Sequence, residues 1–120
     1  MAAAARAYRP IFRDAVRQVF EDFDVLIAPT TPCPAPLIGQ STMMLNGEEV
    51  SVRRNLGAYT QPLSYIGLPV LAAPVNRPGA LPAGVQLIAP PWREDLALAT
   101  GLRLERAGVV AAHAPPGSPG

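Results

Sequence analysis

Residues 66–89, which read IGLPVLAAPVNRPGALPAGVQLIA, decide the fold of this chain. The stretch holds two apolar runs, 69–75 and 85–89, on either side of a segment rich in proline and glycine. Short apolar runs without polar alternation are typical of strands that are buried on both faces. The proline and glycine of residues 78–84 favour a turn. The stretch therefore predicts two buried strands joined by a turn region.

The residues nearer the N-terminus add a third strand and a hairpin. Residues 24–29 form another short apolar run, which predicts a buried strand. The four prolines within 29–36 exclude a helix there and predict an extended loop. Asn46-Gly47, in the middle of residues 42–52, is the favoured two-residue turn of a β-hairpin.

Three segments are expected to be helical. The first precedes residue 24, and the strong helix formers before Pro10 favour a helix that continues through this proline. Because no side chain caps its start, we expect Met1 to lie within a longer helix of a truncated gene, split reading frame or fragment. Residues 55–66 predict a short helix broken near Pro62, and residues 92–107 predict a final helix that Gly108 ends. An apolar stripe at helical spacing marks the first helix: Tyr8, Phe12, Ala15, Val16, Val19, Phe20 and Phe23.

The order of elements predicts an α/β unit over residues 1–113 and a disordered tail over 114–120, which has nothing to bury. Two long helices and a hairpin barely cover a sheet that is buried on both faces. We therefore expect a partner or a further part of the polypeptide to cover the rest. Alone, the chain should be poorly soluble or molten, because uncovered apolar faces and open sheet edges favour aggregation.

The composition excludes several classes of function. The 120 residues carry a net charge of +1, so no basic field exists for nucleic acid or an anionic membrane. The chain has one cysteine (Cys33), one histidine (His113) and no lysine, which disfavours a multi-histidine metal site and a Ser-His-Asp triad and excludes a lysine base. Nothing local brings Cys33 and His113 together as a nucleophile pair. The compartment stays open, with the cytoplasm as the default expectation.

A polar cluster between the apolar segments is the candidate binding site. Arg53 and Arg54 are followed within a few residues by Tyr59, Thr60 and Gln61. Polar side chains next to an aromatic one, on a loop between buried strands, are typical of small-molecule pockets. Helix capping and a solvated surface explain the same residues equally well. The PxxP spacing of residues 29–32 is better explained by a rigid exit from the strand than by peptide recognition.

Several segments, in the same order, resemble the amidase-signature enzymes. Residues 23–32 are similar to the family's "DVLLTPTTP" segment, residues 66–75 to "GLPALSVP", and residues 81–89 to "LPVGLQLIG". The residues from Glu94 onward resemble the family's last helix. The resemblance covers the C-terminal part of the family. It implies a partial amidase-like α/β fold, with the C-terminal strands of a mixed central sheet, flanking helices and a hairpin insertion.

The resemblance implies hydrolysis of linear amide C–N bonds without metal or cofactor. In these enzymes a lysine begins a proton relay, and a serine attacks the amide carbonyl to give an acyl-enzyme. That Ser–Ser–Lys triad lies upstream of the matched region, so no catalytic residue is assigned here, and we expect the chain to be inactive alone. The alternative is a non-catalytic interaction module or the relic of a truncated gene. The missing lysine favours this alternative.

Within the family, four segments look like the catalytic subunits of 1-carboxybiuret hydrolases: residues 34–40, 55–57, 60–62 and 89–95. This similarity implies small urea-like substrates and a small partner subunit. The amidotransferase subunits of the family that act on charged transfer RNA have an acidic residue where this chain has Gly57 and an asparagine at the position of Ser64, which argues against a glutaminase. In the complete enzyme we expect Tyr59, Thr60 and Gln61 to line the amide pocket, with Arg53 and Arg54 as secondary candidates.

Overall fold

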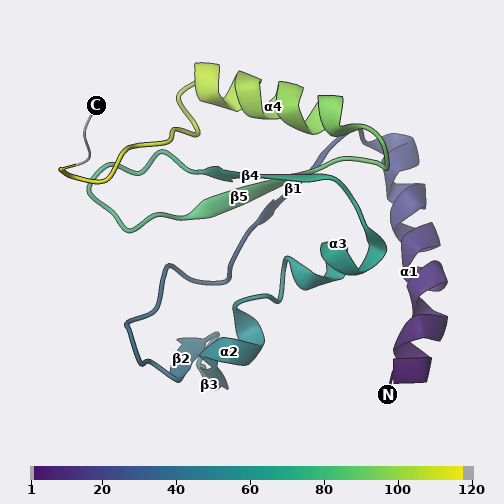
Figure 1. The fold of residues 1–120 in the computed structure, drawn as a ribbon, viewed down its shortest axis with the longest axis horizontal. Coiled ribbons are helices and arrows are strands. Elements are labelled where there is room, and N and C mark those ends of the chain that lie inside the picture. The colour runs from purple at the N-terminus through teal and green to yellow at the C-terminus, as the bar shows by residue number, and fades with distance from the viewer. Residues whose placement is uncertain (1, 118–120) are drawn as a thin grey trace.

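A computed structural model describes residues 2–117 and agrees with the expected order of elements (Figure 1). Its elements are α1 (Ala2–Asp22), β1 (Leu26–Pro29), β2 (Thr42–Leu45), β3 (Glu48–Ser51), α2 (Val52–Asn55), α3 (Gln61–Ile66), β4 (Val70–Pro74), β5 (Gly84–Ile88) and α4 (Glu94–Arg106). The predicted α/β class is confirmed. Every strand pair among these elements is antiparallel.

The main sheet has three strands in the order β1-β5-β4. Because β5 pairs with both neighbours, it forms the core, and Leu87 has no exposed surface. The prediction that all three strands are buried on both faces holds only for β5. Along β1 and β4, exposed residues alternate with half-buried ones, and Ile27 is 62% exposed. These two strands are the edges of the sheet here, so part of their apolar surface has no neighbour.

One face of the sheet is covered by α4 (Figure 1). The helix approaches β4 so closely at Gly101 that a Cβ there would lie 2.4 Å from Cδ2 of Leu71. Its end is as predicted: Gly108 has φ of 75°, and its N–H donates to the carbonyl of Glu105. The next N–H, from Val109, donates to the carbonyl of Leu104, which completes a Schellman cap.

The segment after α4 returns to the outer edge of β4. Val110 forms a β-bridge with Val75, and the N–H of Ala111 donates to the carbonyl of Pro74. Residues 111–115 form neither helix nor strand, and residues 116–117 form a turn. Residues 118–120 of the predicted tail lie outside the described residues, so its disorder stays a prediction.

The hairpin and the short helices lie on the side of the sheet away from α4 (Figure 1). Asn46 and Gly47, with φ of 50° and 83°, make the predicted tight turn between β2 and β3. The prediction of one short helix broken near Pro62 is wrong. The chain forms two helices, α2 and α3, and the interruption is at residues 56–60. Pro62 lies in the first turn of α3, where a missing N–H costs no hydrogen bond.

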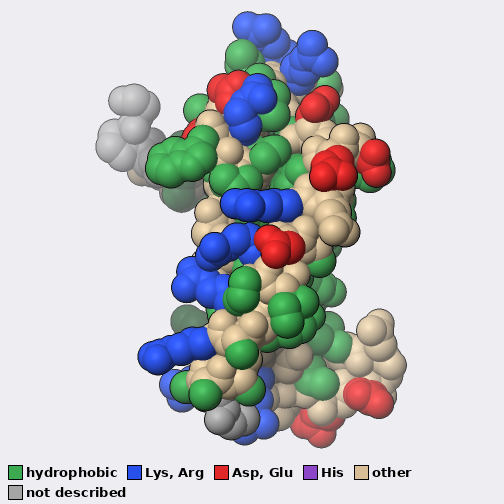
Figure 2. Space-filling view, turned by 90° about the vertical axis from the view of Figure 1, so that its right-hand side faces the viewer, with side chains coloured by type: hydrophobic (Ala, Val, Ile, Leu, Met, Phe, Trp, Pro, Cys, Tyr) green, Lys and Arg blue, Asp and Glu red, His purple; other side chains and the backbone are tan. Residues whose placement is uncertain are grey.

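The first helix, α1, is continuous through Pro10, as predicted. None of its described residues is buried. Phe12, Val16 and Phe20 are half-buried, whereas Ile11 and Val19 of the same helix are exposed. Figure 2, which looks onto this side of the molecule, shows arginine side chains spread over the face with apolar side chains between them. The apolar surface of α1 is therefore wider than the part that the described residues cover.

No helix in residues 2–117 combines the length and the apolar character that crossing a lipid bilayer requires.

The exposed apolar surface predicts the behaviour of the isolated 120-residue chain. We expect it to bind the dye ANS and to lack a cooperative thermal transition, because α1 and the outer strands leave apolar side chains in water. ANS fluorescence and near-UV circular dichroism on heating measure both properties. A sharp cooperative melt of a monomer would contradict this prediction.

Candidate functional site

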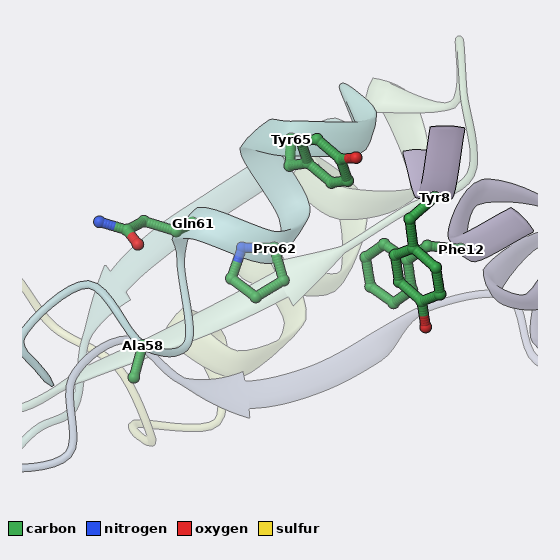
Figure 3. Close-up of a pocket in the computed structure, with 6 residues that line it drawn as sticks. All are labelled: Tyr8, Phe12, Ala58, Gln61, Pro62 and Tyr65. Atoms are coloured by element: carbon green, nitrogen blue, oxygen red, sulfur yellow. The ribbon is translucent and has the colours of Figure 1, made fainter. Parts of the chain in front are cut away.

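An open cavity of about 460 Å³ lies between α1 and α3 (Figure 3). It is lined by Tyr8, Phe12, Ala58, Gln61, Pro62 and Tyr65. Its walls are mostly apolar. Apart from the two tyrosine hydroxyls, the amide of Gln61 is the polar side-chain group among these lining residues, and it can both donate and accept hydrogen bonds. An apolar hollow with few polar groups is the usual form of a small-molecule site.

Aromatic contacts fix the two helices around the cavity. The rings of Tyr8 and Phe12, one turn apart on α1, are stacked with centroids 6.3 Å apart and planes within 11°. From α3, the hydroxyl of Tyr65 donates a hydrogen bond to the carbonyl of Ala5. The guanidinium of Arg9 lies 5.6 Å from the centroid of the Tyr65 ring, a cation–π distance. The cavity wall therefore depends on residues far apart in the sequence.

Gln61 stands at the rim of the cavity. Figure 3 shows its side chain pointing away from Tyr8 and Phe12. The side chain folds back over the preceding turn, where a Cβ on Gly57 would lie 2.8 Å from Nε2 of Gln61. The absence of a side chain at position 57 therefore leaves the space that the Gln61 amide occupies.

The structure places the other predicted site residues around this turn or away from it. Tyr59 is partly exposed, and its carbonyl accepts a hydrogen bond from Nε2 of Gln86 at 3.0 Å. The hydroxyl of Thr60 donates to the carbonyl of Gly57 at 3.4 Å, within the turn itself. Of the five predicted residues, Gln61 alone is among those that line the cavity.

Arg53 and Arg54 lie in α2, at the end of the hairpin, and both are exposed. The hydroxyl of Ser51 accepts a hydrogen bond from the N–H of Arg54 at 3.4 Å and so caps this helix. Neither arginine lines the cavity between α1 and α3.

Sequence reasoning missed the aromatic residues of the site. Tyr8 and Phe12 belong to the predicted apolar stripe of the first helix, which is compatible with a role in the cavity wall. Tyr65 follows Gln61 by four residues, so both lie on one face of α3. That spacing is the one local signal that could have linked Tyr65 to the predicted site.

The other chemically reactive residues have separate partners. The thiol of Cys33 lies 3.3 Å from the sulfur of Met43, and Nε2 of His113 lies 3.2 Å from Oδ1 of Asn76. Nowhere in residues 2–117 do three His, Cys, Asp or Glu side chains gather as a metal site. Arg93 forms a bidentate ion pair with Asp95. The hydrogen bonds from Arg93 hold the pKa of the exposed Asp95 carboxyl below its usual value.

The chain matches a known family over most of its length. The sequence model of the family described as Amidase matches residues 1–98. The chain belongs to the amidase family. This match confirms the resemblance that residues 23–32, 66–75 and 81–89 indicated.

Curated amidase relatives are similar over most of this chain. AtzE, a 1-carboxybiuret hydrolase subunit of Pseudomonas sp. (strain ADP), is 45% identical over 109 residues, which are 88% of this chain and 24% of the relative. A glutamyl-tRNA(Gln) amidotransferase subunit from Akkermansia muciniphila is 37% identical over 91 residues, or 72% of this chain and 18% of the relative. The chain thus spans about a quarter or less of the length of these proteins.

Solved structures agree with the partial fold. One, described as a vestigial protein complex that reveals the evolutionary origins of an s-triazine catabolic enzyme, superposes with a TM-score of 0.85 at 41% identity. The superposition covers 91% of our chain and 24% of the solved chain. An amidase crystal structure gives a TM-score of 0.71 at 29% identity over 79% of this chain.

The close approach of Gly57 and Gln61 can be tested directly. Gly57→Ala is expected to move the Gln61 side chain, because the new Cβ needs the space of its amide nitrogen. The backbone should tolerate alanine there, since φ of Gly57 is not left-handed. In ¹⁵N spectra of the labelled chain, recorded with the N-terminal part of AtzE present, the Gln61 side-chain resonances should shift, whereas those of Gln40, bonded to Leu37 and Thr42, should stay. An unchanged Gln61 signal in a folded variant would place that side chain elsewhere.

Proposed function

We propose that this chain is the C-terminal part of an amidase-type hydrolase that cleaves linear amide C–N bonds in small urea-like molecules such as 1-carboxybiuret. The observation that carries the proposal is the 45% identity to a 1-carboxybiuret hydrolase subunit over 88% of this chain. The matched amidotransferase subunits have lower identity, and Gly57 leaves no carboxylate to hold the amino group of glutamine.

In this proposal the chain supplies a wall of the substrate pocket and not the reacting groups. The 120 residues contain no lysine, so a Ser–Ser–Lys triad must come from another part of the enzyme. The primary amide of Gln61 matches the donors and acceptors of an amide or urea group. Tyr59 and Thr60 belong to the same turn, and Arg53 and Arg54 remain secondary candidates for an anionic part of the substrate.

The partner in this proposal is the N-terminal part of an amidase domain. The relatives are about four times as long as the match, since 24% of AtzE is covered. The exposed apolar residues of α1, including Ile11 and Val19, give such a partner a surface to cover. A small additional protein chain is the second candidate, because one similar structure is described as a protein complex.

A non-catalytic interaction module or gene relic is the rival function. The absence of lysine and of a Gly/Ser-rich signature favours it for the chain taken alone. The adjoining DNA separates the two: an upstream reading frame with the signature and its lysine supports the enzyme, and an unrelated upstream gene supports the rival.

Complementation tests the proposed hydrolase. The purified chain is expected to release no ammonia from 1-carboxybiuret alone and to do so when mixed with the N-terminal three quarters of AtzE, because the mixture then contains both the triad and the pocket wall. Ammonia release over time measures the reaction. No activity in a mixture that forms a stable complex would contradict the proposal, and activity of the chain alone would show that it carries reacting groups of its own.

A matched pair of variants tests the α1 surface in the same assay. Val19→Asp should weaken complex formation, because it places a charge in an apolar contact. Gln18→Asp adds the same charge to the neighbouring polar position on the helix and should leave assembly intact. Equal behaviour of the two variants would exclude the apolar side of α1 as the docking surface.

Gln61→Ala tests the pocket wall in the active mixture. We expect kcat/KM to fall about tenfold, because an amide that bonds the substrate is lost. Gln40→Ala removes the same side chain from the remote loop and should have no such effect. If Gly57→Ala acts by displacing Gln61, it should add nothing further in the Gln61→Ala background. An unchanged kcat/KM in Gln61→Ala would remove Gln61 from the pocket.

A further inference from the structure

Gln86 is the buried polar residue of the sheet. It lies in the middle of β5 and is 2% exposed, and it is the one polar or charged residue among the described residues that is buried. Glutamine is mostly exposed in folded proteins, so a buried one is informative. A buried amide is retained at little cost only where its hydrogen bonds are satisfied.

The amide nitrogen of Gln86 joins two segments that are distant in the sequence. Nε2 donates to the carbonyl of Pro29, at the end of β1, at 2.9 Å. It also donates to the carbonyl of Tyr59, in the turn before α3, at 3.0 Å. A primary amide has two N–H donors, and these two carbonyls use both of them.

The hydrogen bond to Tyr59 links the sheet directly to the turn of residues 57–61. Within the turn, the backbone hydrogen bonds are local: the N–H groups of Thr60 and Gln61 both donate to the carbonyl of Gly57. Local bonds define the shape of the turn, but on their own they are only marginally stable and do not set its position relative to β5. The donor from Gln86 supplies that position.

We propose that Gln86 is a positioning residue that holds the turn of Tyr59, Thr60 and Gln61 against the sheet, and thereby sets the place of Gln61 at the rim of the cavity. The role in catalysis rests on the proposed hydrolase function. The role in fixing the turn does not, because it depends only on the two hydrogen bonds of the Gln86 amide.

Hydrogen exchange tests the fixing of the turn without any assay of activity. Gln86→Met keeps the length and shape of the side chain but removes both donors. The protection factors of the amides at residues 58, 60 and 61 should fall about tenfold relative to the wild-type chain, measured with the N-terminal part of AtzE present. Gln40→Met is the matched control, since it should loosen only residues 37–42, where Gln40 is bonded.

Gln86→Glu separates hydrogen bonding from packing. An ionised carboxylate has no donor, whereas the protonated acid regains one, so protection of residues 58, 60 and 61 should recover as the pH falls through the titration of the new carboxyl. Tyr59 is the only titratable residue of β1, β4, β5 and residues 56–60. The charged residues near β5 belong to α4, which packs on the opposite face of the strand, beside Leu87. A variant that merely packs poorly shows no such recovery.

The outcomes are distinct. Loss of protection in Gln86→Met, with recovery of Gln86→Glu at low pH, supports the positioning role. Unchanged protection in Gln86→Met, or wild-type residues 57–61 that exchange freely, overturns it. In the active mixture, Gln86→Met should raise KM about tenfold with a smaller change in kcat. A wild-type mixture without activity defeats the proposed hydrolase, and the exchange result still decides the role of Gln86.

Discussion

The double pairing of β5 is the constraint on which the rest of this structure depends. Its backbone holds β1 on one side and β4 on the other, and its side chains reach both faces of the sheet. On one face Leu87 packs with Leu71 beneath Gly101 of α4. On the other face Gln86 binds the turn before α3. The helix α4 on one face and the turn before α3 on the other are therefore both positioned relative to five residues of one strand.

This arrangement gives the described residues a paired sheet and an incompletely covered surface. Antiparallel ladders and the α4 contact are made entirely within the described residues. By contrast, α1 has no buried residue, and its main contact is with α3. The cavity lies between this partly covered helix and α3, which the preceding turn joins to the sheet. Under the proposed function, the part of the enzyme that covers α1 also completes this cavity.

The sequence predicted those elements that depend on local chemistry. Apolar runs marked the three strands, Asn46-Gly47 marked the hairpin, and Gly108 marked the end of α4. It did not predict the exposure of β1 and β4, because an apolar run reports what a strand can bury and not which neighbours are present. The cavity was beyond local reasoning for a related reason. Ala5 and Tyr65 meet across more than fifty residues, and no pattern within either helix specifies that contact.

The ends of β1 and β4 have a consequence for how the sheet can grow. Pro29 and Pro74 lie at the same end of the sheet, opposite Val85 and Gly84 of β5. Neither has an N–H, and their carbonyls already accept from Gln86 and Ala111. Beside Pro74 the segment after α4 already occupies the edge of β4, through the bridge between Val75 and Val110. Strand addition is therefore disfavoured at this end of the sheet, whereas the opposite ends of β1 and β4 carry no such proline.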